Sequence, residues 1–457
     1  MREHLNYFRS FLGETQVASA KTELIEYGND SCPEFKGEAG LVLFPQTYDE
    51  VSRVLSYCHQ NLLAVVPSGG RTGYSGGATA TRSEIVLSLS KLNKILEVDR
   101  QAATLVCQAG ALTEAVQNSA MSQGLYYPVD FASKGSSQIG GNLATNAGGI
   151  RVVRYGSTRD WVLGMKAVLA SGEILELNGA LVKNRSGYDL HQLLMGSEGT
   201  LAVIVEATLK LCYPPPQSRL AFCAVADLTR GLEAFSALLS EGYVVNVFEF
   251  LDALSLRKVL EHKQSSKAPF QESYPYYLVI EVDAQPKFEE RVAKFLEDGV
   301  FANAVVAQSS IQARELMSLR EQISESIRVF PPHKNDLSVP LKNIPSFVDK
   351  LGALLNKLYP DFEFALFGHI GDGNIHLNVL KPPGLQVPEF LSVVHAREPE
   401  IFELTQSMGG SVSAEHGIGL AKKSALKFVR SASEIQLMQG IKRVFDPNHI
   451  LNPGKIW

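Results

Sequence analysis

The 457-residue chain lacks the features that would tie it to a membrane or to nucleic acid. No apolar run approaches the roughly 18 residues that a membrane-spanning helix needs. The net charge is −5 and there is no long basic run, so a nucleic-acid partner is not expected. The first residues, MREHLNYFRSFLGETQ, contain acids and no apolar core. We therefore expect neither a secretory signal nor a transit peptide.

Cysteine is also scarce: the five residues are scattered, and no C-x-x-C pair occurs. This usage is typical of reduced thiols in a cytosol, so we expect a cytoplasmic protein, with peripheral membrane association left open. The composition, 45% hydrophobic and 20% charged, is that of an ordinary globular protein. At about 150 residues per domain, the length predicts two or three domains.

Two glycine-rich stretches lack the common nucleotide-binding signatures. PSGGRTGYSGGATA (67–80) contains neither G-x-G-x-x-G nor a terminal G-K-[ST]. GSSQIGGNLATNAGGIRVVRYGS (135–157) interleaves the apolar residues Ile139, Leu143 and Ala147 with its glycines. This pattern predicts a buried, ordered segment whose backbone approaches a large ligand closely, rather than a flexible surface loop.

The order of predicted elements indicates an α+β protein. Residues 41–67 read as a βαβ unit, with a capping box at Thr47 and Glu50. Two hairpins should turn near 99–102 and at 171–172, so the first half is not a doubly wound Rossmann domain. CYPPPQ (212–217) marks a boundary, because three prolines cannot continue a strand or helix. Alternating strands and helices beyond it predict one antiparallel sheet, followed by a helix near 431–445.

The segment FGHIGDGNIHLNV (367–379) predicts a hairpin that carries two histidines. If Ile370 pairs with Ile375, then His369 faces His376 across the ladder, and Asn378 lies on the same face. Two convergent imidazoles and a carboxylate form a recognised set for a divalent metal. A candidate carboxylate is Glu415, and two polar histidines without a metal remain the alternative.

Four motifs, in order, resemble the FAD-binding oxidoreductases of the vanillyl-alcohol oxidase (PCMH) type: SGGRTG (68–73), IGGNLATNAGG (139–149), GSEGT (196–200) and NPGK (452–455). The resemblance implies a PCMH-type FAD-binding domain over 1–214 and an antiparallel-sheet substrate (cap) domain over 215–410. A short C-terminal helical segment, 411–457, would return to complete the FAD and active site. Arg71 and Ala202 stand where the family usually has Asn and Gly, and Arg71 would add a charge near the phosphates.

The resemblance also implies how FAD is held. The first loop would wrap the pyrophosphate with successive N–H groups. Neither 67–80 nor 128–156 contains a His or Cys for covalent attachment, so FAD should be noncovalent. The implied FAD-binding residues are Pro67, Ser68, Gly69, Gly70, Arg71, Thr72, Gly73, Gly76, Pro128, Gly140, Gly141, Asn142, Thr145, Asn146, Gly148, Gly149, Tyr155, Gly156, Glu198, Ile204 and Asn452.

Within that family, two further motifs are similar to those of the D-2-hydroxyglutarate and D-lactate dehydrogenases. These are G-H-x-G-D-G-N-x-H and S-A-E-H-G-x-G, both intact here. They imply His369, His376 and Glu415 as ligands of a divalent ion, typically zinc, and His416 as the catalytic base. The stretch 319–340 resembles the hydroxyglutarate branch, which implies that Arg320, Ser324 (where Thr is more usual) and Lys334 hold the substrate. Asn378, on the face of the two histidines, is the fourth candidate substrate residue.

The activity implied is oxidation of a small D-2-hydroxy acid to the 2-oxo acid, with hydride passing to FAD. D-2-hydroxyglutarate is favoured, and D-lactate or glycolate stay open. The electron acceptor is undetermined among an electron-transfer flavoprotein, a quinone, a cytochrome and a second oxo acid, and a homodimer is also left open. The alternatives are a flavin-binding subunit of a glycolate-oxidase-type complex and a non-redox transferase of the alkylglycerone-phosphate synthase kind. The histidine run of those transferases is absent here.

Overall fold

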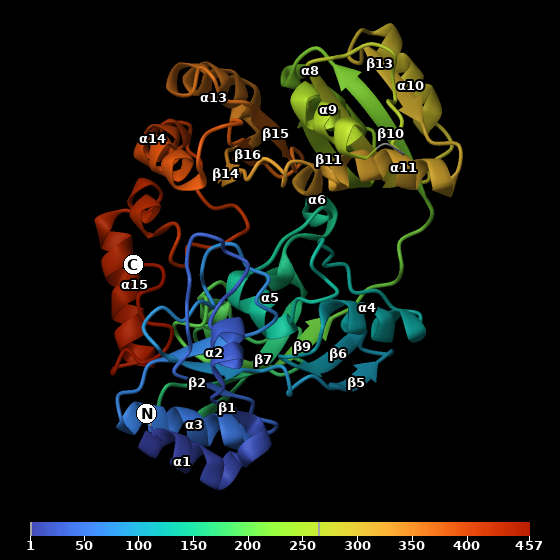
Figure 1. Cartoon of the computed structure of the whole chain (residues 1–457). Coiled ribbons are helices and arrows are strands. Elements are labelled where there is room, and N and C mark those ends of the chain that lie inside the picture. The colour runs from blue at the N-terminus through green and yellow to red at the C-terminus, as the bar shows by residue number, and fades with distance from the viewer. Residues whose placement is uncertain (1, 264–265) are drawn as a thin grey trace. The chain divides into compact units, whose positions relative to one another are not determined.

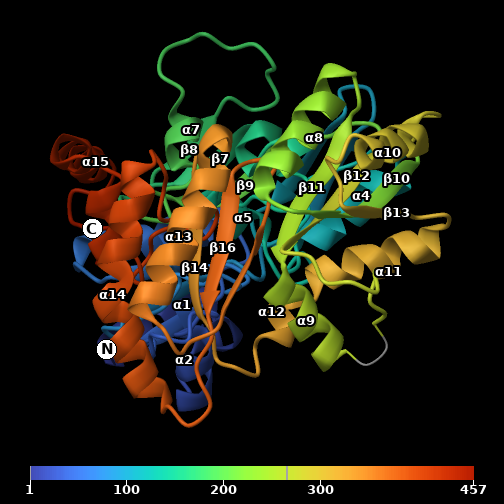
Figure 2. The same ribbon diagram turned by 90° about the horizontal axis from the view of Figure 1, so that it is seen from above.

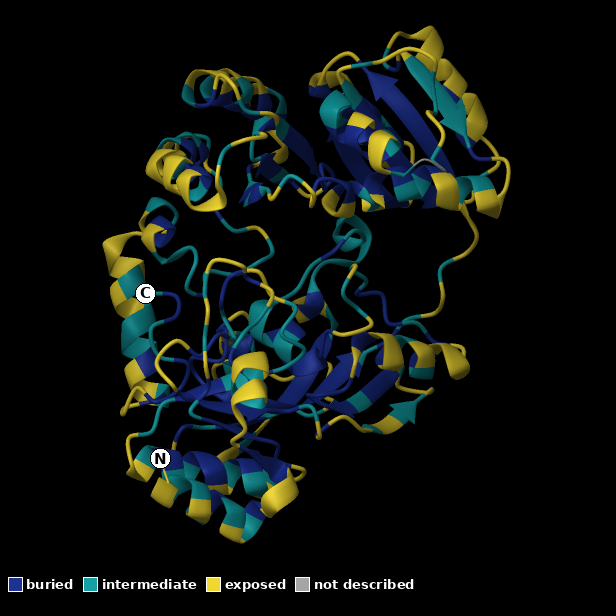
Figure 3. Cartoon of the chain, viewed as in Figure 1, coloured by how far each residue is buried: buried dark blue, intermediate teal, exposed yellow. Residues whose placement is uncertain are grey.

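A computed structural model describes residues 2–263 and 266–457 and contains two compact units (Figure 1). Unit 1 comprises the chain up to Gly149, Tyr155–Pro214 and Glu415–Trp457, and unit 2 comprises Ile150–Arg154 and Pro215–Ala414. In both units the strands are mostly buried and the helices expose their outer faces (Figure 3). None of the helices in the described parts of the chain is both long and apolar enough to cross a bilayer.

Unit 1 contains a four-stranded and a five-stranded sheet. The first has the order β1 (Val17–Ala18), β2 (Leu41–Leu43), β4 (Ile85–Ser88), β3 (Val65–Ser68). The second has the order β5 (Ile95–Asp99), β6 (Thr104–Gln108), β9 (Val203–Lys210), β7 (Val162–Val168), β8 (Ile174–Leu177). The helices are α1 (Arg2–Leu12), α2 (Lys21–Tyr27), α3 (Tyr48–Gln60), α4 (Thr113–Ser122), α5 (Ile139–Thr145), α7 (Leu190–Leu194) and α15 (Ala432–Phe445). Helix α6 (Val152–Tyr155) spans the boundary between the units.

The βαβ unit and both hairpins predicted for this half are confirmed. Thr47 caps α3 by accepting the Glu50 N–H at 3.1 Å, and the Glu50 carboxylate accepts the Thr47 N–H at 3.3 Å. The local pattern of the segment EIVLSLS (84–90) did not reveal where its strand, β4, lies in the sheet. Strand β4 lies between β2 and β3 and is parallel to both, because the residues after the glycine loop return to the centre of the sheet.

Unit 2 is built on one antiparallel sheet, as predicted. Its order is β13 (Asn303–Val306), β10 (Ser218–Val225), β12 (Tyr276–Asp283), β11 (Val245–Asp252), β15 (Phe364–Gly368), β16 (Asn374–Val379), β14 (His333–Ser338). Its helices are α8 (Leu228–Ser240), α9 (Ala253–His262), α10 (Phe288–Glu297), α11 (Ser310–Glu321), α12 (Ile323–Ser326), α13 (Ile344–Leu358) and α14 (Val387–Ser407).

The two faces of this sheet carry different helices (Figure 2). Phe235 of α8 packs on Phe248 of β11, with ring centroids 4.6 Å apart. The opposite face, which includes Leu251 and Phe367, forms one apolar cluster with residues of α9, α11 and α12. Along a strand, successive side chains alternate between faces. Glu249, Phe367 and His376 therefore lie on the α11 side of the sheet.

The hairpin of β15 and β16 has a different register from the one predicted. His376 pairs with Phe367, not with His369, so the Ile370–Ile375 pairing is wrong. The strands end sooner because the loop is anchored elsewhere: the Gly371 N–H donates to the Phe248 carbonyl at 3.1 Å. The error is two residues, which preserves the face of every side chain. His369 and His376 still share one face, as diagonal rather than opposed neighbours.

Candidate functional site

The first candidate site is a glycine-lined cradle in unit 1, formed by the loop after β3 and the segment leading into α5. Gly70 lies so close to this segment that a Cβ would stand 2.1 Å from the Ser136 carbonyl oxygen. Gly73 and Gly141 are the opposite case, because a Cβ on either would have no atom within 4 Å. The two stretches therefore pack tightly at one point and leave open space beside it.

Unpaired polar groups surround this cradle. Within residues 2–263 and 266–457, the backbone N–H groups of 70–73 donate no hydrogen bond. In the same described residues, the side-chain oxygens of Ser68, Gln138 and Asn452 are buried without a partner. Buried polar groups normally find partners, so these call for a ligand. Successive N–H groups suit phosphate oxygens, and the oxygens suit hydroxyl and N–H groups, so the cradle fits a flavin nucleotide.

Two other predicted FAD-binding residues, Glu198 and Asn452, form hydrogen bonds between the chain segments that make up the cradle. The Glu198 carboxylate accepts the N–H groups of Ile418 and Gly419, both at 2.8 Å. Asn452 donates to the carbonyls of Gly77 at 2.8 Å and Glu198 at 2.7 Å. Burial raises the pKa of Glu198, an effect that the two N–H donors partly offset. The loop, the 196–200 turn and the C-terminal tail thus form one connected structure.

Several polar residues among the predicted FAD-binding residues form hydrogen bonds within the protein. Asn142 donates to Thr113 at 2.7 Å, and Thr145 donates to the Gly141 carbonyl at 3.0 Å. Asn146, at φ 50°, ends α5 and accepts the Arg159 N–H at 2.9 Å. The remaining members also lie in unit 1: Pro67, Gly69, Thr72, Gly76, Pro128, Gly140, Gly148, Gly149, Tyr155, Gly156 and Ile204.

Arg71 makes contacts that the sequence did not predict. Its guanidinium lies 4.1 Å from the centre of the Tyr27 ring and 3.5 Å from a Glu26 oxygen. Both partners belong to α2, so the structure uses this side chain to hold the loop against that helix. The backbone of Arg71 has φ 55°, which helps to turn the loop.

His416 is also held in unit 1, beside the glycine loop. The Ser75 hydroxyl donates to the His416 carbonyl at 2.6 Å, which fixes its backbone. The Tyr74 ring lies 5.4 Å from the imidazole, at an interplanar angle of 58°. The backbone of His416 is thus fixed to the loop, and its ring lies against an aromatic neighbour.

The second candidate site is a pair of imidazoles on the α11 side of the unit 2 sheet. The His369 and His376 rings lie 5.2 Å apart and almost perpendicular, at 85°. Nδ1 of His369 lies 2.7 Å from a Glu249 oxygen. Nδ1 of His376 lies 3.6 Å from an Asp336 oxygen, and both carboxylates are almost fully buried. Each ring thus turns Nδ1 toward an acid, the orientation in which Nε2 is the usual metal-ligating nitrogen.

Glu415 directly follows a segment whose backbone is bonded to the unit 2 sheet. Residues 411–413 pair with the outer edge of β14, at Ser338 and Asp336. The Ala414 N–H then donates to the Asp336 carbonyl at 3.2 Å, and Glu415 follows directly in the chain. Glu415 is the carboxylate predicted from the sequence as the third candidate ligand, beside His369 and His376. Two imidazole nitrogens and a carboxylate oxygen are a donor set that suits zinc and similar divalent ions.

The residues predicted to hold substrate separate into two groups in unit 2. Lys334 on β14 stands directly opposite Asn378 on β16, two residues along from the Asp336–His376 pair. Burial, and secondarily the charge of Arg328, lowers the pKa of Lys334. Arg320 projects from α11, where Nη2 lies 2.8 Å from Glu249 and the guanidinium lies 4.8 Å from the centre of the Phe367 ring. Ser324 is exposed on α12.

Two acids in this site were missed from the sequence, Glu249 and Asp336. Glu249 offers a usable signal, since it is the single charged residue inside the apolar run VNVFEFL (245–251). A buried charge in a strand requires a partner, so its position pointed to a functional contact. Asp336 lies inside the stretch 319–340 that was singled out from the sequence, but its polar neighbours in HKNDLS gave no sign that its side chain would be buried.

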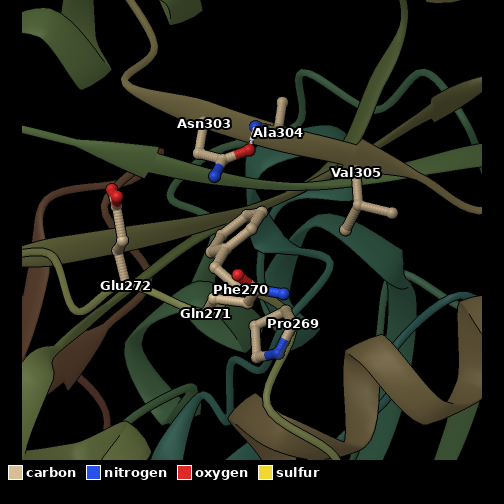
Figure 4. Close-up of a pocket in the computed structure, with 7 residues that line it drawn as sticks. All are labelled: Pro269, Phe270, Gln271, Glu272, Asn303, Ala304 and Val305. Atoms are coloured by element: carbon tan, nitrogen blue, oxygen red, sulfur yellow. Dashed lines mark hydrogen bonds between the residues drawn. The ribbon is translucent and has the colours of Figure 1, made fainter.

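A separate pocket of about 390 Å³ lies at the other end of the unit 2 sheet (Figure 4). It is lined by residues 269–272 and by Asn303, Ala304 and Val305 of β13. Its one charged residue is Glu272, and none of its lining residues is a cation. It therefore does not suit an anionic substrate.

Comparison with known proteins gives two matches to family models and close relatives over nearly the whole chain. Residues 39–178 match an FAD binding domain, and 214–456 match the C-terminal domain of FAD linked oxidases. A D-2-hydroxyglutarate dehydrogenase of Xanthomonas citri pv. viticola is 47% identical, over 97% of this chain and 94% of that protein. One of Stutzerimonas stutzeri is 42% identical, over 97% and 96%.

Solved structures share the fold. The 4-ethylphenol oxidase of Gulosibacter chungangensis superimposes with a TM-score of 0.76. The match covers 100% of this chain and 97% of that one at 16% identity, so it supports the architecture alone.

Proposed function

The chain belongs to the FAD-linked oxidases and is an FAD-dependent oxidoreductase, and from this premise we propose that it oxidises D-2-hydroxyglutarate to the 2-oxo acid. The observation that carries the substrate assignment is the row of donors beside the imidazole pair. Lys334 and Asn378 stand opposite each other on the same face as His376. The second carboxylate of a dicarboxylate substrate could accept hydrogen bonds from these two donors. The two relatives described above are both named D-2-hydroxyglutarate dehydrogenase.

Arg320 is proposed to contribute the remaining donor. Its Nη2 is engaged by Glu249, but its Nε–H is buried and has no acceptor among the described residues. A substrate carboxylate would supply that acceptor. Hydrogen bonds between charged partners contribute about 1.5–3 kcal/mol each, so two cations and one amide suffice to orient a small anion. Ser324 is exposed on the neighbouring helix and is proposed as a weaker contact.

His369, His376 and Glu415 are proposed to hold a divalent ion, with zinc favoured by the donor set. When bound, such an ion supplies Lewis acidity, which lowers the pKa of the substrate hydroxyl. His416 is proposed to accept that hydroxyl proton on a ring nitrogen. FAD, when bound, supplies the hydride acceptor for C2.

Two further points extend the proposal. The protein is proposed to be cytoplasmic, because its five scattered cysteines are typical of reduced thiols. Reoxidation needs an acceptor of the electron-transfer flavoprotein, quinone or cytochrome class, or a second oxo acid.

The direct test is anaerobic mixing of the purified protein with a panel of D-2-hydroxy acids, followed through the visible flavin absorbance. We expect D-2-hydroxyglutarate to bleach the flavin fastest, with D-lactate and glycolate slower. A faster response to D-lactate would overturn the dicarboxylate assignment and leave the reaction class intact. Bleaching by none of the acids would favour a non-redox transferase or a non-catalytic subunit.

The flavin should be releasable. The cradle residues 67–80 contain no His or Cys, and the N–H groups of 70–73 offer hydrogen bonds rather than a covalent bond. After acid precipitation we expect the yellow colour in the supernatant, with the chromatographic mobility of FAD. Colour retained in the washed pellet would exclude noncovalent binding.

Lys334→Ala should change selectivity. If Lys334 donates a hydrogen bond to the distal carboxylate, kcat/KM for D-2-hydroxyglutarate should fall about 10- to 150-fold, because one charged hydrogen bond is lost. D-Lactate has no distal carboxylate and should lose much less. Equal losses for both acids would place Lys334 at the shared C1 carboxylate instead. The exposed Lys342→Ala is a matched control and should leave both values unchanged.

A further inference from the structure

Glu249 is a buried carboxylate held between a cation and an imidazole. It lies on β11, and its side chain is 1% exposed. One oxygen lies 2.7 Å from Nδ1 of His369, and the other lies 2.8 Å from Nη2 of Arg320. Arg320 itself is 9% exposed and rests on the Phe367 ring at 4.8 Å. The three side chains come from β11, α11 and the end of β15, so tertiary packing alone assembles them.

This arrangement decides which nitrogen of His369 carries the proton. A carboxylate accepts hydrogen bonds and donates none, so it selects the form of His369 with a proton on Nδ1. In the neutral ring, Nε2 then keeps its lone pair and would be the atom that ligates a metal ion. The ion pair with Arg320 restrains the Glu249 carboxylate in turn, because Nη2 lies 2.8 Å from the second oxygen, although the angles at that contact are not those of a hydrogen bond.

We propose that Glu249 is a positioning residue that holds His369 in the Nδ1–H tautomer with Nε2 directed to the metal, and that Arg320 holds Glu249 in place. The inference rests on the proposed metal site of His369, His376 and Glu415. Arg320 then has two functions, since Nη2 orders Glu249 while its buried Nε–H serves the substrate. Asp336 occupies the corresponding position beside His376, but its carboxylate oxygen lies 3.6 Å from Nδ1, so it orients that ring less strongly.

Glu249→Gln tests the tautomer directly. The Arg320 guanidinium only donates, so it will attract the Gln carbonyl oxygen, and the Gln NH2 group will face Nδ1 of His369. That group donates, which imposes the Nε2–H tautomer and removes the lone pair from the ligating atom. Zinc affinity of the metal-depleted, flavin-containing protein, measured by competition with a chromophoric chelator, should fall about 10- to 100-fold.

A matched control separates this effect from the loss of a buried charge. Glu281 is also buried on the α11 side of the same sheet and lies 3.5 Å from an arginine, Arg151. Glu281→Gln should leave zinc affinity unchanged. The second readout is ¹⁵N NMR of histidine-labelled protein without metal, in which the His369 signal, assigned by His369→Gln, should report Nδ1–H in the wild type and Nε2–H in Glu249→Gln.

The outcomes are distinct. A wild type that binds no zinc would remove the proposed metal site. A wild type that binds zinc, with unchanged affinity and tautomer in Glu249→Gln, would overturn the role of Glu249. If Glu249→Gln fails to fold, the wild-type spectrum still decides the matter, because a His369 proton on Nε2 there contradicts the inference.

Discussion

Replacing His416 with alanine is expected to lower the rate of flavin reduction by D-2-hydroxyglutarate about 10²–10⁴-fold, the usual contribution of a general base. Ser75 and Tyr74 hold this residue through its carbonyl and its ring, so the truncation removes the imidazole and leaves the Ser75 bond to the backbone. The cradle for FAD should therefore stay intact. The measurement is single-turnover flavin bleaching under anaerobic conditions.

Two controls make this result interpretable. Glu415 precedes His416 and is a proposed metal ligand, so metal content must be measured on the same sample. His262→Ala, at an exposed histidine of α9, should retain the wild-type rate. Near-normal flavin reduction in metal-replete His416→Ala protein would remove His416 from the role of base.

Removal of the divalent ion is expected to abolish turnover while FAD stays bound. A Lewis acid at a developing alkoxide contributes several kcal/mol, which corresponds to roughly 10³-fold or more in rate. FAD should remain because its cradle lies in unit 1, whereas His369 and His376 belong to unit 2. The experiment is prolonged chelation with elemental analysis, followed by addition of zinc or manganese.

His376→Ala should reproduce this loss and resist rescue by added metal. The imidazole pair would lose one of its two nitrogens, and a divalent ion bound by the remaining ligands would be held far more weakly. His262→Ala again serves as the matched control. Full turnover in a sample shown to be free of metal would exclude a catalytic ion.

The sequence alone determined the family, the α+β class and the local elements. The resemblance to FAD-binding oxidoreductases is confirmed, because four short motifs in fixed order are specific even when each alone is not. The capping box at Thr47 and the hairpins of unit 1 were predictable because hydrogen bonds between near neighbours specify them. The face shared by His369 and His376 followed from the two-residue period of a strand.

Tertiary structure decided the partners of those residues. The hairpin register was set by the bond from Gly371 to Phe248 on another strand, which no local pattern encodes. Glu249 meets His369 across 120 residues of sequence, and Arg320 comes to the same carboxylate from a helix. A histidine motif in the sequence indicates which imidazoles are candidate metal ligands. Their tautomers and directions depend on buried charges brought together by packing, because a carboxylate in the interior must find a donor wherever the fold supplies one.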